Sequence, residues 1–124
     1  MTTLSRVLLV EPQFVLRRTI AMVGRDLGIV DFHEASSVGR ARTLLMTDTF
    51  AGLVLDLQEG QQALDLISDI RRSQLAPPND LRIVVLAADL LPGEASRLQE
   101  LQVQCVLTKP LRISDLLKAI VVPK

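Results

Sequence analysis

The chain has 124 residues, of which 48% are hydrophobic and 23% are charged. This length is typical of one domain, and the composition is that of a chain that buries a core and folds alone, which excludes a disordered segment. Fourteen basic and fourteen acidic side chains give a formal net charge of zero, which disfavours nucleic acid or an anionic membrane as a direct ligand.

Cysteine and histidine each occur once, as Cys105 and His33. This pair predicts neither an internal disulfide nor a zinc or haem site, which is typical of a protein from a reducing compartment. Both lie in strand patterns, so we read Cys105 as a small buried residue and His33 as a packed or edge residue. Since the N-terminus lacks the parts of a signal peptide and no apolar run approaches the roughly 18 residues of a membrane span, we expect a cytoplasmic protein without membrane contact.

Short apolar runs alternate with stretches of helical spacing along the first half of the chain. Arg6–Val10 predicts a strand buried on both faces, and Gln13–Gly28 predicts a helix that the glycine terminates. Ile29–Ala35 predicts a second strand, and Ser36 and Ser37 are candidate caps of a second helix.

The second half continues this alternation. Ala51–Leu57 predicts a third strand, and Gln61–Ser73 predicts a helix that ends before the breaker cluster Pro77–Asp80. The remaining predicted elements are a strand over Arg82–Ala87, a short helix from Pro92–Gly93 to about Leu101, a strand over Val103–Leu107, and a last helix that Ser114 caps and that turns Leu116, Leu117, Ile120 and Val121 inward.

Five strands alternating with five helices predict a doubly wound α/β fold in one domain over residues 1–124. Right-handed crossovers place helices on both faces of a parallel sheet. In such sheets the functional groups gather beyond the carboxyl ends of the strands. We therefore expect the site in the loops that start at Glu11, Asp56, Ala87 and Thr108.

Three charged side chains at these strand ends suit phosphoryl chemistry. Glu11 follows the first strand, Asp56 lies near the end of the third, and Lys109 follows the fifth. Two carboxylates can hold a divalent cation, because hard cations prefer oxygen ligands, and a lysine can neutralise phosphate charge.

From Arg6 to Val121 the chain resembles the receiver domain of bacterial two-component response regulators. The family pattern of an acidic pair, a phosphate-accepting Asp, a Ser/Thr and a Lys-Pro falls on Glu11–Pro12, Asp56, Ala87 and Lys109–Pro110. The resemblance implies a flavodoxin-like strand order 2-1-3-4-5 and a phosphoprotein in which Asp56 takes the phosphoryl group from a histidine kinase or phosphotransfer protein. It also implies that Lys109 pairs with the acyl phosphate and that its bond to Pro110 is cis.

The resemblance further implies a Mg²⁺ site made by Glu11, Asp56 and the backbone of Gln58. A direct ligand is missing, because Pro12 stands where the family has its second acid and Mg²⁺ demands near-octahedral oxygen coordination. Glu59, three residues after Asp56, is our candidate substitute, in a loop about one residue shorter than usual. We expect Mg²⁺ binding to be weak or absent.

Both parts of the family's conformational switch are also replaced. Ala87 stands in place of the hydroxyl, and Val106 stands in place of the aromatic residue three positions before Lys109. Since a ligand shifts only an equilibrium between states that it binds differently, these changes favour a degenerate receiver, read by its partner in one conformation, over a switch phosphorylated at Asp56. The resemblance implies that output is a protein contact on the face of the fourth helix, fifth strand and fifth helix.

Simpler interpretations stay open for each residue. Asp56 can be a strand-end carboxylate that accepts bonds from loop amides, Lys109 can be an ion-pair partner, and Glu11 and Glu59 can be solvated loop acids. A flavodoxin-like ligand-binding protein is a further alternative, although the first loop lacks the residues that cradle phosphates, and we expect no enzyme because no nucleophile–base set is present. The sequence leaves open whether the chain is complete or excised from a longer protein, and in which oligomeric state it works.

Overall fold

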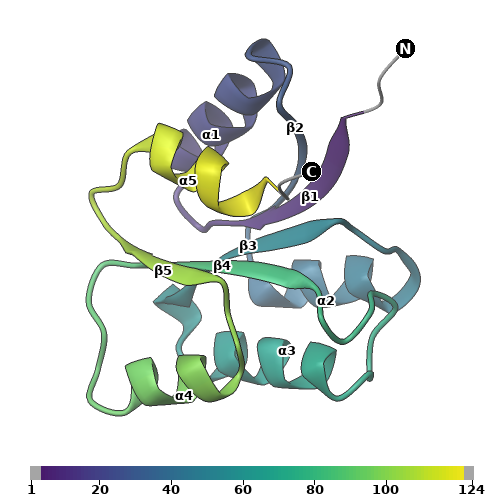
Figure 1. Cartoon of the computed structure of the whole chain (residues 1–124), viewed down its shortest axis with the longest axis vertical. Helices are drawn as coiled ribbons and strands as arrows, with labels where there is room; N and C mark the ends of the chain where they lie inside the picture. The colour runs from purple at the N-terminus through teal and green to yellow at the C-terminus, as the bar shows by residue number, and fades with distance from the viewer. Residues whose placement is uncertain (1–3, 122–124) are drawn as a thin grey trace.

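The computed structural model describes residues 4–121. Its centre is a five-stranded parallel sheet in the order β2-β1-β3-β4-β5, with helices on both faces (Figure 1). The predicted doubly wound fold and its strand order are confirmed. The elements are β1 (Ser5–Val10), α1 (Phe14–Asp26), β2 (Val30–Ala35), α2 (Val38–Thr47), β3 (Gly52–Asp56), the 3₁₀ turn η1 (Leu57–Glu59), α3 (Gln61–Arg71), β4 (Arg82–Ala87), α4 (Glu94–Glu100), β5 (Cys105–Thr108) and α5 (Ile113–Ile120).

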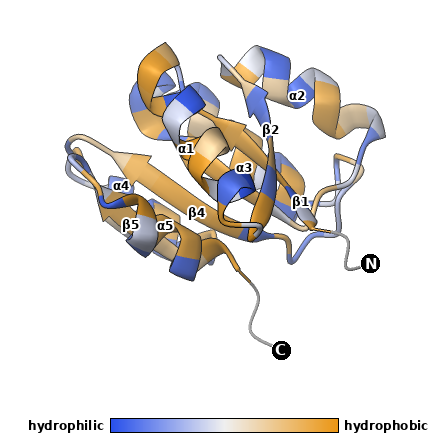
Figure 2. Cartoon of the chain, turned by 90° about the horizontal axis from the view of Figure 1, so that it is seen from above, coloured by the Kyte–Doolittle hydropathy of each residue, from blue (hydrophilic) through white to orange (hydrophobic). Residues whose placement is uncertain are grey.

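The sheet separates two hydrophobic cores. Helices α1 and α5 cover one face, and α2, α3 and α4 cover the other, as Figure 1 shows. Successive side chains of a strand point to opposite faces, so Leu53 belongs to the core under α2 and α3 while its neighbour Val54 belongs to the core under α1 and α5. Because the central strand β3 is buried along its whole length, the residues before Asp56 form a continuous apolar run. The neighbouring strand β4 is also hydrophobic, as Figure 2 shows.

The ends of α1 and α2 follow their sequence signals. Gly28 lies two residues past α1 with a φ of 66°, and its N–H donates to the carbonyl of Arg25 at 2.9 Å, so the glycine terminates this helix as predicted. At the start of α2 the hydroxyl of Ser37 accepts a hydrogen bond from the N–H of Arg40 at 3.1 Å. The cap predicted for α2 is confirmed at Ser37.

Several predicted boundaries are wrong by one or two residues. Helix α3 ends at Arg71 because Ser73 takes a left-handed φ of 59°, and β3 ends at Asp56 because Leu57 enters the 3₁₀ turn. The predicted cap of α5, Ser114, lies inside the helix, since the extended residue Arg112 already precedes the first turn. Val121 follows the end of this helix and is 38% exposed, so its predicted inward position is wrong.

Candidate functional site

The carboxyl ends of β1, β3 and β5 bring three charged residues together at one edge of the sheet. Glu11 follows β1, Asp56 ends β3, and Lys109 follows β5. Hydrogen bonds fix the backbone on both sides of this edge: Glu11 donates its N–H to the carbonyl of Ala35 at 3.1 Å, and Lys109 donates to that of Ala87 at 2.8 Å. The parallel sheet thus assembles the cluster predicted from the sequence.

Both oxygens of the Asp56 carboxylate have a donor. Only 4% of the residue is exposed; one oxygen accepts from the N–H of Gln58 at 2.7 Å, and the other lies 2.6 Å from the ammonium of Lys109. The first of these bonds caps the η1 turn. Asp56 therefore has the contacts of a strand-end carboxylate and, in addition, a buried ion pair.

Glu11 is fully buried, so the alternative reading of this residue as a solvated loop acid is wrong. One oxygen of its carboxylate accepts a hydrogen bond from the N–H of Gln13 at 3.1 Å, and the other accepts one from the ammonium of Lys109. Buried charges persist in proteins when they are paired and hydrogen-bonded, and Glu11 meets both conditions.

Lys109 bridges the two acids. Its side chain is 13% exposed, and its ammonium contacts one oxygen of each carboxylate. Burial lowers the pKa of this ammonium, but hydrogen bonds and Coulombic attraction from Asp56 and Glu11 outweigh that effect and raise the pKa above the usual value for lysine. Lys109 is consequently a permanent cation at neutral pH. The peptide bond between Lys109 and Pro110 is cis, as the resemblance implied.

A cleft of about 460 Å³ opens beside the charged cluster. Its lining comes from the loops after β1, β3, β4 and β5: Gln13, Asp56, Leu57, Gln58, Ala87, Ala88, Asp89 and Lys109. No serine, threonine or tyrosine is among these lining residues, and the last residue of β4 and the one that follows it are the alanines Ala87 and Ala88. Within this cleft the sole side-chain cation is therefore Lys109.

Glu59 does not join the cluster around Asp56. One oxygen of its carboxylate accepts a hydrogen bond from the N–H of Val38 at 2.6 Å, at the first residue of α2. That N–H has no partner within the helix, and a carboxylate at a helix N-terminus also interacts favourably with the helix dipole. Glu59 caps α2, and our expectation that it would replace the missing metal ligand is not supported by this arrangement.

The donor set does not fit Mg²⁺ as it stands. Each oxygen of Glu11 and Asp56 already accepts from a nitrogen, and Pro12 has no side-chain oxygen. Gln58 contributes an N–H donor to this cluster. Over residues 4–121, no group of three or more His, Cys, Asp or Glu side chains is placed to hold a metal ion. Octahedral coordination by these oxygens would have to compete with the ammonium of Lys109, which already lies between the two acids.

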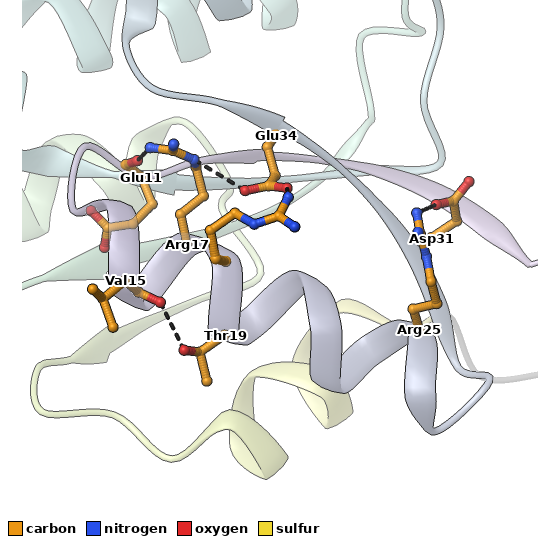
Figure 3. A network of polar contacts seen from close by, with 8 residues as sticks. Glu11, Val15, Arg17, Thr19, Arg25, Asp31 and Glu34 are labelled. Carbon is orange, nitrogen blue, oxygen red and sulfur yellow. Dashed lines mark hydrogen bonds and ion pairs between the residues drawn. The ribbon is translucent and has the colours of Figure 1, made fainter.

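Arg17 in α1 supports the site and was not predicted from the sequence. Its guanidinium donates to the backbone carbonyl of Glu11 at 2.9 Å and pairs with Glu34 at 3.2 Å, as Figure 3 shows. Arg18 pairs with the other oxygen of Glu34 at 2.6 Å. These contacts tie the loop that carries Glu11 to the end of β2. A signal was available, since Arg17 lies about one turn into the helix that follows Glu11, but its partner Glu34 is distant in sequence.

His33 and Cys105, which the sequence predicts to lie outside the site, are not among the residues that line the cleft. His33 is on the edge strand β2, where its ring stands edge-on to Phe50 with 5.7 Å between centroids and contacts a carboxylate oxygen of Asp31 at 3.3 Å. Cys105 is a free thiol and is only partly buried, and burial raises its pKa. The prediction of a packed or edge histidine is confirmed, whereas Cys105 is less buried than expected.

Comparison with solved structures identifies the class of fold. The chain is similar to a response regulator receiver protein from Pseudomonas putida, with 28% identity, a TM-score of 0.83, and coverage of 97% of this chain and 98% of that chain. A sensor protein from Polaromonas sp. JS666 is 27% identical, with a TM-score of 0.78 and coverage of 94% and 92%.

A response regulator protein from Burkholderia pseudomallei, with a phosphorylated aspartic acid, a calcium ion and citrate, matches at 22% identity and a TM-score of 0.78, covering 94% of this chain and 66% of that chain. Neither the comparison with protein-family models nor that with curated proteins gives a match. The structures nevertheless agree with one another, and the resemblance to response regulator receivers is confirmed: this chain has the receiver fold over nearly its whole length. No helix among the described residues is long and apolar enough to cross a membrane.

Proposed function

We propose that this chain is an atypical receiver module of two-component signal transduction that acts through protein–protein contacts and is not an enzyme. The observation that carries the proposal is the cluster at the sheet edge, where Asp56 at the end of β3 pairs with Lys109 after β5 at 2.6 Å. The similarity to the Pseudomonas putida receiver over almost the whole of both chains supports it. In this proposal the module works in a cytoplasmic pathway, downstream of a histidine kinase or phosphotransfer protein.

Within this class we propose that the partner reads one fixed conformation, in preference to a state set by phosphorylation of Asp56. A phosphoryl group on Asp56 would meet a methyl group at Ala87 and no hydroxyl in the cleft lining. Val106, which replaces an aromatic residue of the family's switch, is already half-buried in β5. Because of these two changes, a phosphoryl group on Asp56 would make few contacts that differ between two conformations of the domain. Phosphorylation would therefore shift the equilibrium between those conformations only slightly.

In this proposal the downstream protein partner binds the face formed by α4, β5 and α5. Leu98 is the only fully buried residue of α4, and the other residues of this helix are exposed or half-buried. Strand β5 is an edge strand whose residues are half-buried or exposed. A surface of this kind can accept a partner without unfolding any part of the domain.

The proposal is tested by recording amide NMR spectra with Mg²⁺ and beryllofluoride, a phosphoryl mimic, on the native protein and on Asp56→Asn. We expect no saturable shift in the native protein at millimolar concentrations, where weakly held hard cations still bind. Saturable shifts around Asp56 and Lys109 that vanish in Asp56→Asn would instead establish phosphorylation-dependent switching. A yellow preparation that carries a flavin would favour the flavodoxin-like alternative over both.

A further inference from the structure

The charged cluster contains its own cation. Two carboxylates with four oxygens and one ammonium give this group a formal charge of −1, and the ammonium lies between the two acids. Glu11 is fully buried and Asp56 is 4% exposed, so the charges of both acids need a partner inside the protein. Lys109 is placed where a metal ion shared by the two carboxylates would have to bind.

The polar atoms around the cluster are already satisfied. The carboxylate oxygens that do not contact Lys109 accept from the N–H groups of Gln13 at 3.1 Å and Gln58 at 2.7 Å. In the part of the chain that the structure describes, no buried side-chain nitrogen or oxygen lacks a hydrogen-bond partner. An entering divalent cation would therefore meet oxygens that each already have a nitrogen partner, and would have to compete with the ammonium for the position between the two acids.

We infer that the ammonium of Lys109 is the resident cation of this site, and that it holds Glu11 and Asp56 together in place of a divalent metal ion and excludes such an ion from the folded domain. This inference goes beyond the proposed signalling role, because it concerns what neutralises the site and holds for any partner that the domain has. It makes the folded state independent of Mg²⁺ and predicts a latent cation site that removal of the ammonium exposes.

The test compares thermal unfolding of the native protein and of Lys109→Met with and without about 10 mM magnesium chloride, a range in which weak carboxylate sites bind. Sodium chloride matches the ionic strength of the samples without magnesium. Lys118→Met, which removes an exposed ammonium from α5, is the matched control. We expect Mg²⁺ to leave the Tm of the native protein and of Lys118→Met unchanged, and to raise the Tm of Lys109→Met by about 4 °C or more, because an ion that binds only the folded state stabilises it.

Each outcome is decisive. A rise in Tm of the native protein with Mg²⁺, or saturable amide shifts at Glu11 and Asp56 with magnesium chloride alone, would overturn the inference while leaving the receiver proposal intact. Absence of any Mg²⁺ response in Lys109→Met would also overturn it, since the two acids would then form no latent site. If Lys109→Met is unfolded without metal, recovery of its native circular dichroism on adding Mg²⁺ supports the inference, and persistence of the unfolded spectrum contradicts it.

Discussion

Lys109 determines how the two buried acids are tolerated. Removing one member of a buried ion pair costs about 3 to 5 kcal/mol, because an uncompensated charge is left behind. Here a single ammonium serves two carboxylates, so its loss leaves both Glu11 and Asp56 without their cation. Loss of Lys109 alone is therefore expected to destabilise the folded state.

The pH dependence of stability follows from the same contacts. The pKa of Lys109 is higher in the folded state than in the unfolded chain. The stabilisation that the protonated side chain provides is therefore fully present below the pKa of the unfolded state, about 10.4, and is lost as pH rises through the higher pKa of the folded state. We predict that the free energy of unfolding falls as pH increases above about 10.4, and that Lys109→Met shows a smaller fall. Urea unfolding followed by circular dichroism, over a series of alkaline buffers, measures this slope.

Cys105 must be removed from this comparison. Burial raises its pKa, so its deprotonation also lowers stability as pH rises. Both proteins are therefore measured with Cys105→Ala in the background. Equal slopes in the two proteins would show that the ion pair of Lys109 is not the source of the alkaline loss.

Some residues of the site were predictable and others were not, for a physical reason. Asp56 and Lys109 could be placed from the sequence because the ends of parallel strands meet at one edge of a sheet. The partner of Glu59 could not, since its carboxylate contacts an N–H 21 positions away, and this contact depends on how the η1 turn directs the side chain. The role of Arg17 likewise depends on a partner 17 positions away on another element.

At the scale of elements, α2 has two caps from different parts of the chain. Ser37 binds the N–H of Arg40 within the same turn, while Glu59 reaches from the loop after β3 to the N–H of Val38. Gly60 follows with a φ of 60° and a ψ of −120°, a conformation that residues with a side chain rarely adopt. The loop after Asp56 is thus anchored to α2 on one side and shaped by a glycine on the other.

We predict that Glu59→Ala and Ser37→Ala each lower the free energy of unfolding by about 1 kcal/mol, the usual cost of losing a cap. The two variants should differ in local hydrogen exchange. Glu59→Ala should accelerate exchange at the amide of Val38, and Ser37→Ala should accelerate it at the amide of Arg40. Unchanged exchange at Val38 in Glu59→Ala would show that the contact from Glu59 does not stabilise the start of α2.

Sequence patterns predicted the elements better than their boundaries. Ser37 is recognisable because it directly precedes an apolar helical pattern, and the same rule predicts a cap at Ser114. The rule failed at Ser114 because Ile113, half-buried against the core under α1 and α5, begins the helix one residue earlier. Packing of one apolar side chain outweighed a capping preference of about 1 kcal/mol.

At the scale of the molecule, β3 joins two cores that otherwise lie on opposite faces of the sheet. Leu53 and Val54 are adjacent in sequence and fully buried, each in a different core. A domain with two cores on one sheet unfolds in a single transition when both cores depend on the same strands. Successive side chains of β3 and β4 point alternately into the two cores, so both cores depend on these strands.

We therefore predict that shortening a buried side chain on either face of the sheet lowers the midpoint of one shared unfolding transition. Leu53→Ala should cost about 2 to 5 kcal/mol and Val54→Ala somewhat less, because fewer carbon atoms are removed. Leu27→Ala, at a residue that is 61% exposed, is the control and should change stability by less than about 0.5 kcal/mol. Circular dichroism and amide NMR should report coincident transitions in all three variants. Separate midpoints for amides on the two faces would contradict a single cooperative unit.

The bond between Lys109 and Glu11 joins residues 98 positions apart, near the two ends of the described chain. While the protein is being synthesised, both acids of the cluster are therefore present long before Lys109 is added to the chain. A chain that stops before β5 has to keep two carboxylates hydrated at the edge of an unfinished sheet, which opposes burying that edge early. The contact between Lys109 and Glu11 that balances these charges thus forms late and joins distant residues, and contacts of this kind slow folding. The native sheet can be completed only after its last strand has been synthesised.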